Sequence, residues 1–96
     1  MSDLIIIARA QAKPGFEAAL VAAQTALVAL SRQQPGCIAY ELHEDLEQPG
    51  KVLFYERWTD RNAWENHIAG AHSVAFRDQA GGWVAESELL QMRQVA

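Results

Sequence analysis

Side chains that could exchange protons with a ligand are concentrated between residues 35 and 77, a segment that contains all three histidines. Within it, Glu56 lies in an alternating stretch whose neighbours on the same side are the apolar Phe54 and Trp58. A carboxylate there must be hydrogen-bonded, paired with a cation or protonated, because an isolated buried charge is costly. Glu56 is therefore a candidate pocket acid or base, an ion-pair partner of an arginine, or a solvated rim residue. The arginines that could pair with it are Arg9, Arg57 and Arg93.

The histidines differ in what their positions predict. His67 shares a predicted helical face with Trp64 and Ile68, so it points inward. It is either a satisfied core side chain or a group that hydrogen-bonds to a substrate hydroxyl or accepts its proton. His72 is a second pocket candidate or a cap for the helix that follows it, and His43 alternates onto a polar strand face that we expect at the surface. The spacing between His67 and His72, with no cysteine or glutamate at ligand spacing, predicts no metal site.

Aromatic side chains in the same segment could form the walls of a pocket. They are Tyr40, Phe54, Trp58, Trp64 and Phe76. Taken singly, each is more simply explained as core, but together they suit a flat aromatic ligand. Cys37 follows Pro-Gly at a strand start without a basic neighbour, which indicates a small hydrophobic residue and not a nucleophile. As the single cysteine, it excludes an internal disulfide.

The segments that must position these groups follow a split β-α-β-β-α-β order. The predicted elements are a strand over Leu4–Ala12, a helix from about Pro14 to Gln33, strands over Cys37–Asp45 and Val52–Thr59, a helix over Arg61–Ala69, a helical turn over His72–Gln79 and a strand over Trp83–Arg93. The first helix is predicted to bury a stripe spaced by three and four residues. That stripe consists of Phe16, Leu20, Ala23, Leu27 and Leu30. Pro49 and Gly50 favour a type II turn between the two middle strands.

This order predicts an α+β, ferredoxin-like fold with a four-stranded antiparallel sheet and helices on one face. In the strands Leu4–Ala12 and Val52–Thr59, both sides carry apolar residues. The face without helices therefore needs a partner. The simplest arrangement is a homodimer whose two sheets pack face to face.

Size and charge narrow the class of protein further. We expect one domain over residues 1–96, since two would each be too small for an adequate core. The net charge of −4 and the scattered basic residues argue against nucleic-acid binding. Apolar runs such as Leu4–Ala8 are far shorter than the roughly 20 residues that span a bilayer. The N-terminal residues lack a signal-peptide pattern, which predicts a cytoplasmic protein without a membrane partner.

Four strings of the sequence resemble the antibiotic biosynthesis monooxygenase family, and within it the small quinol monooxygenase-like branch. They are ARAQAKPGFEAAL, PGCIAYELHED, LFYERWTD and AWENHIAGAHSVAF. The most specific feature is Y-E-x-W at the end of one strand, followed by N-H and x-H-x-x-x-F in the next helices. The resemblance extends over nearly the whole chain.

This resemblance implies a ferredoxin-like fold whose subunits form a dimeric α+β barrel, with a pocket between sheet and helices in each subunit. It also implies oxidation of a small quinol- or polyphenol-like aromatic by molecular oxygen, with no metal, flavin or other cofactor. The candidate catalytic residues are then Glu56, His67 and His72. The candidate substrate-binding residues are Tyr40, Phe54, Trp58, Trp64 and Phe76.

Other functions stay open from the sequence. The haem-degrading branch resembles the chain in fold, but its Asn, Trp and His positions correspond here to Ala8, His67 and Arg77. That residue set is absent, although His67 or His72 could in principle ligate iron. A branch that isomerises a small phosphorylated compound is disfavoured by the scarcity of clustered basic residues. The main alternative to a monooxygenase is a non-catalytic dimeric barrel that binds a small apolar ligand.

Overall fold

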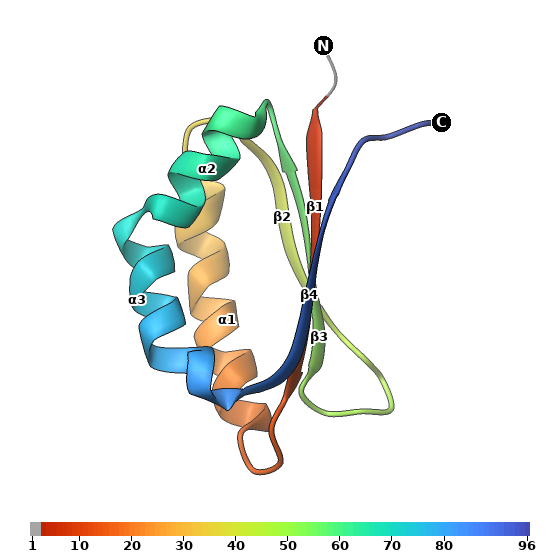
Figure 1. Ribbon diagram of the computed structural model, residues 1–96, viewed down its shortest axis with the longest axis vertical. Coiled ribbons are helices and arrows are strands. Elements are labelled where there is room, and N and C mark those ends of the chain that lie inside the picture. The colour runs from red at the N-terminus through yellow and green to blue at the C-terminus, as the bar shows by residue number, and fades with distance from the viewer. Residues whose placement is uncertain (1–2) are drawn as a thin grey trace.

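The computed structural model describes residues 3–96, which form a four-stranded antiparallel sheet with the helices on one face (Figure 1). The elements are β1 (Leu4–Ala12), α1 (Glu17–Arg32), β2 (Cys37–Glu44), β3 (Lys51–Trp58), α2 (Arg61–Ala69), α3 (Ala71–Ala80), the 3₁₀ turn η1 (Gly81–Trp83) and β4 (Val84–Met92). The predicted α+β, ferredoxin-like class is confirmed. One difference is that the helical turn expected over His72–Gln79 is a full helix, α3, so two helices join β3 to β4. No helix in this part of the chain is long and apolar enough to cross a membrane.

The strand order is β2-β3-β1-β4, so β1 pairs with both β3 and β4. The β2–β3 connection turns at Gly50, whose φ of 78° lies in the left-handed region that favours glycine. Next to it, the Lys51 N–H donates to the Gln48 carbonyl at 3.2 Å. Both features agree with the type II turn that the Pro-Gly pair predicted.

Side chains of β3 alternate between the face covered by helices and the open face. Val52, Phe54, Glu56 and Trp58 are all buried on the covered face, as their period of two predicted. In β2 the alternation is interrupted by a bulge between Cys37 and Ala39. In a regular strand Ile38 would share a face with Tyr40, but here Ile38 is 50% exposed, whereas Tyr40 is buried.

The buried stripe of α1 differs from the predicted one. Its buried residues are Leu20, Gln24, Leu27 and Ser31. Phe16 and Leu30, both expected in the stripe, are 40% and 50% exposed. Phe16 is excluded because α1 begins at Glu17, after a turn in which Gly15 adopts a φ of 91°. The buried stripe contains Gln24 in place of Ala23 and Ser31 in place of Leu30. Two polar side chains therefore lie on the face that packs against the sheet.

This assignment predicts opposite outcomes for two leucines of α1. Leu20→Ala is expected to lower the free energy of unfolding by about 2–5 kcal/mol, since Leu20 is fully buried and its truncation leaves a cavity. Leu30→Ala serves as the matched control and is expected to change it by less than about 0.5 kcal/mol. Urea denaturation followed by circular dichroism measures both. Equal losses in the two variants would show that the predicted stripe, and not the observed one, is buried.

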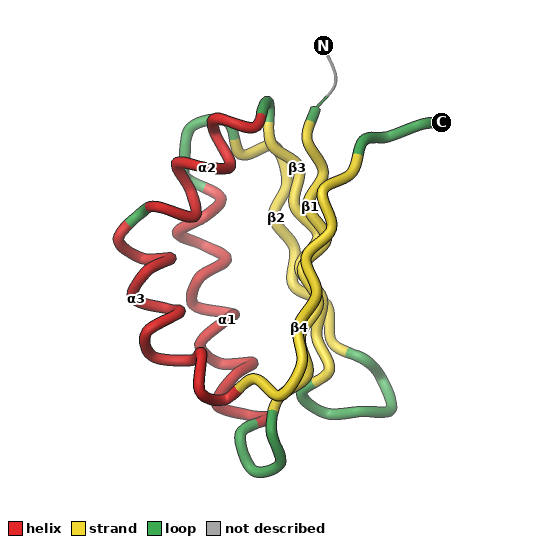
Figure 2. The backbone as a smooth tube through the Cα atoms, in the orientation of Figure 1, coloured by secondary structure: helices red, strands yellow, loops and turns green. Residues whose placement is uncertain are grey.

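The face of the sheet that carries no helix is bare along its length (Figure 2). In β4, Leu90 and Met92 are 36% and 48% exposed. They lie opposite Ile7 and Ile5 of β1 in the sheet register. These four residues form an apolar strip across neighbouring strands. Ile5 is only 8% exposed and Ile7 is half-buried, so most of the exposed area of the strip comes from Leu90 and Met92. A protein partner usually covers a surface of this kind.

Candidate functional site

A hollow of about 470 Å³ lies between the covered face of the sheet and the helices. Of the predicted site residues, those that line it are Tyr40, Phe54, Glu56, His67 and Phe76. The sheet supplies the first three and the helices the other two. The hollow therefore joins the acid of β3, an imidazole of α2 and three aromatic rings around one volume, which is large enough for a small aromatic molecule.

Glu56 lies on an inner strand, opposite Ile6 of β1 and Tyr40 of β2, and is only 4% exposed. Its Oε1 accepts a hydrogen bond of 3.0 Å from the indole N–H of Trp58. Burial raises the pKa of Glu56 to about 7, and the Trp58 hydrogen bond opposes that rise. The carboxyl is thus poised between its protonated and ionised forms near neutral pH, as a proton acceptor requires.

An ion pair does not explain the buried carboxyl. Arg9 pairs with Glu88 at 3.2 Å and Arg57 with Asp3 at 3.0 Å. Within residues 3–96 no arginine forms a salt bridge with Glu56. The ion pair with an arginine, which the sequence left open for Glu56, is therefore wrong. The solvated rim position is wrong as well, because Glu56 is buried.

His67 extends from α2 into the same hollow and is 4% exposed. Its Nδ1 lies 2.5 Å from the side-chain oxygen of Gln34. Burial, followed by the nearby His72 and Arg77, lowers the pKa of His67 to about 4, so the ring is neutral near pH 7. A neutral imidazole carries one N–H, which is needed at Nδ1 to donate to Gln34. His67 Nε2 is then left as a hydrogen-bond acceptor.

His72, Trp58 and Trp64 do not line the hollow. Trp58 and Trp64 are core residues, 0% and 8% exposed, and Trp58 contributes indirectly by donating to Glu56. The His72 ring lies 5.9 Å from that of His67, and its buried Nε2 has no hydrogen-bond partner. His72 does not cap α3, because it lies inside the helix and Gly70 is the residue at the N-cap.

Two polar residues that the sequence analysis passed over also line the hollow. Gln24 of α1 and Ser73 of α3 are each 3% exposed. Gln24 follows Leu20 by four positions and precedes Leu27 by three, so a glutamine at core spacing was the available signal. Ser73 gave no comparable signal, because the helical turn predicted around it was too short to define an inner face.

Exposed lining residues of the hollow come from α3 and β4. Arg77 is the one from α3, and Leu89, which is 50% exposed, is the large apolar one from β4. Arg77 Nη2 donates to the Ile68 carbonyl at 2.8 Å, which ties the arginine back toward α2.

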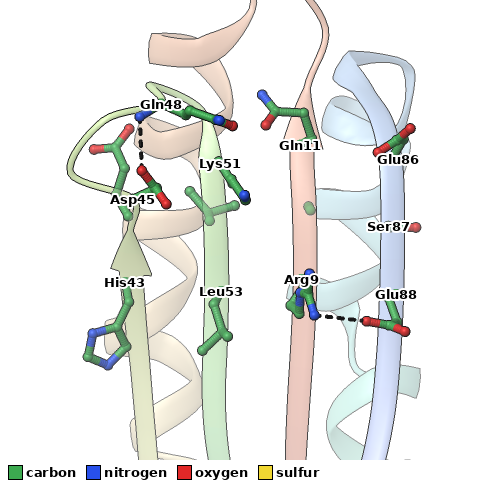
Figure 3. Close-up of a pocket in the computed structure, with 13 residues that line it drawn as sticks. Arg9, Gln11, His43, Asp45, Gln48, Lys51, Leu53, Glu86, Ser87 and Glu88 are labelled. Carbon is green, nitrogen blue, oxygen red and sulfur yellow. Dashed lines mark hydrogen bonds and ion pairs between the residues drawn. The ribbon is translucent and has the colours of Figure 1, made fainter.

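A second hollow, of about 690 Å³, lies on the open face of the sheet (Figure 3). Its charged side chains are exposed, and the pair Arg9–Glu88 spans two of the strands. His43 is also exposed, as predicted, and hydrogen-bonds to Glu41 at 2.9 Å. The titratable side chains that line this hollow are all exposed, whereas Glu56 and His67 in the first hollow are buried. Across residues 3–96, no cluster of three or more His, Cys, Asp or Glu side chains is arranged to hold a metal ion.

Comparison with known proteins supports both the fold and the family resemblance that the sequence strings carry. The profile of the family described as antibiotic biosynthesis monooxygenase matches residues 3–79. "Putative monooxygenase Rv0793" of Mycobacterium tuberculosis is 31% identical over 80 residues, which cover 83% of this chain and 78% of that protein.

Solved structures match over almost the entire chain. The crystal structure of PA3566 from Pseudomonas aeruginosa has a TM-score of 0.95 at 31% identity, covering 100% of this chain and 97% of that one. A crystal structure described as an antibiotic biosynthesis monooxygenase has a TM-score of 0.90 at 30% identity, covering 97% and 99%. The helix-and-sheet arrangement around the first hollow is therefore shared with these proteins.

Proposed function

Because the chain belongs to the antibiotic biosynthesis monooxygenase family, we propose that it oxidises a small quinol- or polyphenol-like aromatic with molecular oxygen, using no metal or organic cofactor. The observation that carries this proposal is that Glu56 and His67 line one hollow together with Tyr40, Phe54 and Phe76. A carboxyl with a raised pKa and a neutral imidazole can accept protons from a phenol. The aromatic walls suit a flat ring and keep water away from it.

In this chemistry the substrate supplies the electrons. Loss of a hydroxyl proton turns a quinol into an anion that can give one electron to O2. The two radicals then join through a new carbon–oxygen bond as a hydroperoxide. Cleavage of the O–O bond, with loss of the ring C–H proton, releases water and leaves a carbonyl. One quinol and one O2 thus give one hydroxyquinone and one water, and the four electrons lost by the quinol reduce O2.

The different environments of these residues give each of them a different proposed role. Glu56 is the proposed proton acceptor, since its pKa of about 7 keeps a substantial fraction ionised near neutral pH. Trp58 holds the carboxyl in place through its indole N–H. His67, fixed by Gln34, offers Nε2 to orient a substrate hydroxyl. The His72 ring lies 5.9 Å from that of His67 and does not line the hollow, so we assign it a positioning role and not contact with the substrate.

The proposed functional unit is a homodimer in which the open faces of two sheets pack together. The apolar strip formed by Ile5, Ile7, Leu90 and Met92 supports this arrangement. A twofold axis would cover the strip of one subunit with the same strip of its partner. The pair Arg9–Glu88 lies beside the strip, where it would form part of a polar rim.

Leu90→Glu is expected to convert the dimer to monomers, because a carboxylate buried in an apolar interface has no partner there. The dissociation constant should rise by about 100-fold or more, measured by sedimentation velocity over a range of concentrations. Leu30→Glu is the matched control, since Leu30 is exposed on α1 and lies away from the open face. A monomeric wild-type protein, or a dimeric Leu90→Glu variant, would contradict the arrangement.

Oxygen uptake tests the proposed reaction. The purified protein, treated with a chelator and shown by absorbance to carry no flavin or haem, is given a panel of quinols in an oxygen-electrode cell. We expect uptake of one O2 per quinol above the rate without protein. One atom of ¹⁸O₂ should appear in the product, without accumulation of hydrogen peroxide. Thermal stabilisation by the quinols without oxygen uptake would contradict the proposal and favour the non-catalytic ligand-binding protein.

A further inference from the structure

Two buried polar side chains in the hollow have no hydrogen-bond partner. They are the Oε1 atom of Gln24 and the Oγ atom of Ser73. Both residues are 3% exposed and both line the hollow from the helix side, Gln24 on α1 and Ser73 on α3. Buried polar groups are nearly always paired, so an unpaired one in a binding cavity indicates a missing partner.

A third buried atom without a partner, His72 Nε2 of α3, belongs to a residue that does not line the hollow. Ser31 of α1 is 0% exposed, and its hydroxyl donates to the Leu27 carbonyl at 2.8 Å. Gln34, just beyond α1, contacts His67 through its side-chain oxygen. Ser31 and Gln34 thus find partners within the protein, whereas Gln24 and Ser73 face the hollow without one.

We infer that Gln24 and Ser73 bind a second polar group of the ligand, on the helix wall and away from Glu56 on the sheet wall. This inference rests on the proposed function for the presence of an aromatic substrate in the hollow. A quinol carries two hydroxyls at separated positions, and these two residues give the second hydroxyl a place on the helix wall. One hydroxyl would be directed to Glu56 and His67, and the second to Gln24 and Ser73.

A hydroxyl fits the second position better than a carbonyl does. A hydroxyl can donate to Gln24 Oε1 and can accept from Ser73 Oγ. A carbonyl can only accept, which would leave Gln24 Oε1 unpaired. A hydroxyl also serves either orientation of the Gln24 amide, since it can meet the oxygen or the nitrogen of that group.

The test compares two ligands that differ at one position. They are 1,4-dihydroxynaphthalene and 4-methyl-1-naphthol, in which a methyl group of similar size replaces one hydroxyl. Calorimetric titration under anaerobic conditions measures binding without any oxidation. We expect the wild-type protein to bind the diol about tenfold or more tightly than the methyl compound, because the latter leaves buried polar groups unpaired.

Gln24→Leu should reduce that preference to about threefold or less, chiefly by weakening diol binding, and Ser73→Ala should reduce it independently. Gln33→Leu, at the exposed end of α1, is the control and should keep the wild-type preference. Thermal unfolding of each variant establishes that it is folded, and Ser73→Ala is the smaller change should Gln24→Leu fail to fold.

The outcomes separate this inference from the proposed reaction. A wild-type protein that prefers the diol, and loses the preference in these variants, supports the inference even if it consumes no oxygen. In that case only the proposed monooxygenase activity would be contradicted. An equal preference in wild type and both variants would overturn the inference, as would a wild-type protein with no preference, whose polar groups would then be bound to water only.

Discussion

Glu56→Gln is expected to lower the turnover of a quinol substrate by about 10²–10⁴-fold, the usual contribution of a positioned general base. Glutamine has nearly the same shape and can still accept the Trp58 hydrogen bond, but it cannot take up a proton. Oxygen consumption at saturating quinol measures the turnover. The affinity for the substrate should change much less, because the fold and the aromatic walls of the hollow stay in place.

The pH dependence gives this prediction a second readout. Because burial raises the pKa of Glu56 to about 7, wild-type turnover should rise with pH as the carboxyl ionises around that value. The residual activity of Glu56→Gln should lack this rise. Glu65→Gln is the control, since Glu65 is exposed on α2 and does not line the hollow, and it should keep both the rate and the profile. Normal turnover in Glu56→Gln would remove Glu56 from the mechanism.

The same variant should remove a loss of stability that develops as the pH rises from about 4.5 to about 7. The folded-state pKa of Glu56 is about 7, against 4.5 as its ordinary value. Between these values the folded protein holds a proton that the unfolded chain has lost, so the free energy of unfolding falls as pH rises. Above pH 7 the full penalty amounts to about 3 kcal/mol. Glu56→Gln has no such penalty and should be more stable than wild type by about that amount at pH 8.

The difference in unfolding free energy between wild type and Glu56→Gln isolates the contribution of Glu56. His67 acts in the opposite direction, since its pKa is lowered to about 4 and its contribution to stability is lost as pH falls below about 6.5. That contribution is common to wild type and Glu56→Gln, so it cancels when their unfolding free energies are subtracted. Urea denaturation from pH 4 to pH 8 should therefore give a difference that grows with pH. A difference independent of pH would mean that Glu56 is solvated in the folded protein. Glu41→Gln, at an exposed position of β2, supplies the control.

Much of the fold was predictable because strand patterns are local. Val52, Phe54, Glu56 and Trp58 recur with a period of two, and successive side chains of a strand necessarily point to opposite faces. The turn at Gly50 was predictable for a similar reason, since Pro-Gly restricts its own backbone angles. These constraints act within a few residues and do not depend on what packs against them. The strings that resemble the family lie in the same segments.

The buried side of α1 was not predictable from its pattern. The helix carries alanine and valine around much of its circumference, so adjacent stripes have similar hydrophobicity. Which stripe is buried depends on the angle at which the helix meets the sheet. The structure selects the one with Gln24 and exposes Leu30. The bulge that turns Ile38 outward is likewise set by pairing with β3.

The sequence by itself determined the strands, the family and the kinds of side chain available for chemistry. Only the tertiary structure decided that Glu56 and His67 share one hollow, that His72 does not line it, and that Gln24 and Ser73 face into it unpaired. The reason is that burial is produced by segments distant in the chain. The raised pKa of Glu56 and the lowered pKa of His67 both follow mainly from that burial, so neither could be assigned until the helices were placed on the sheet.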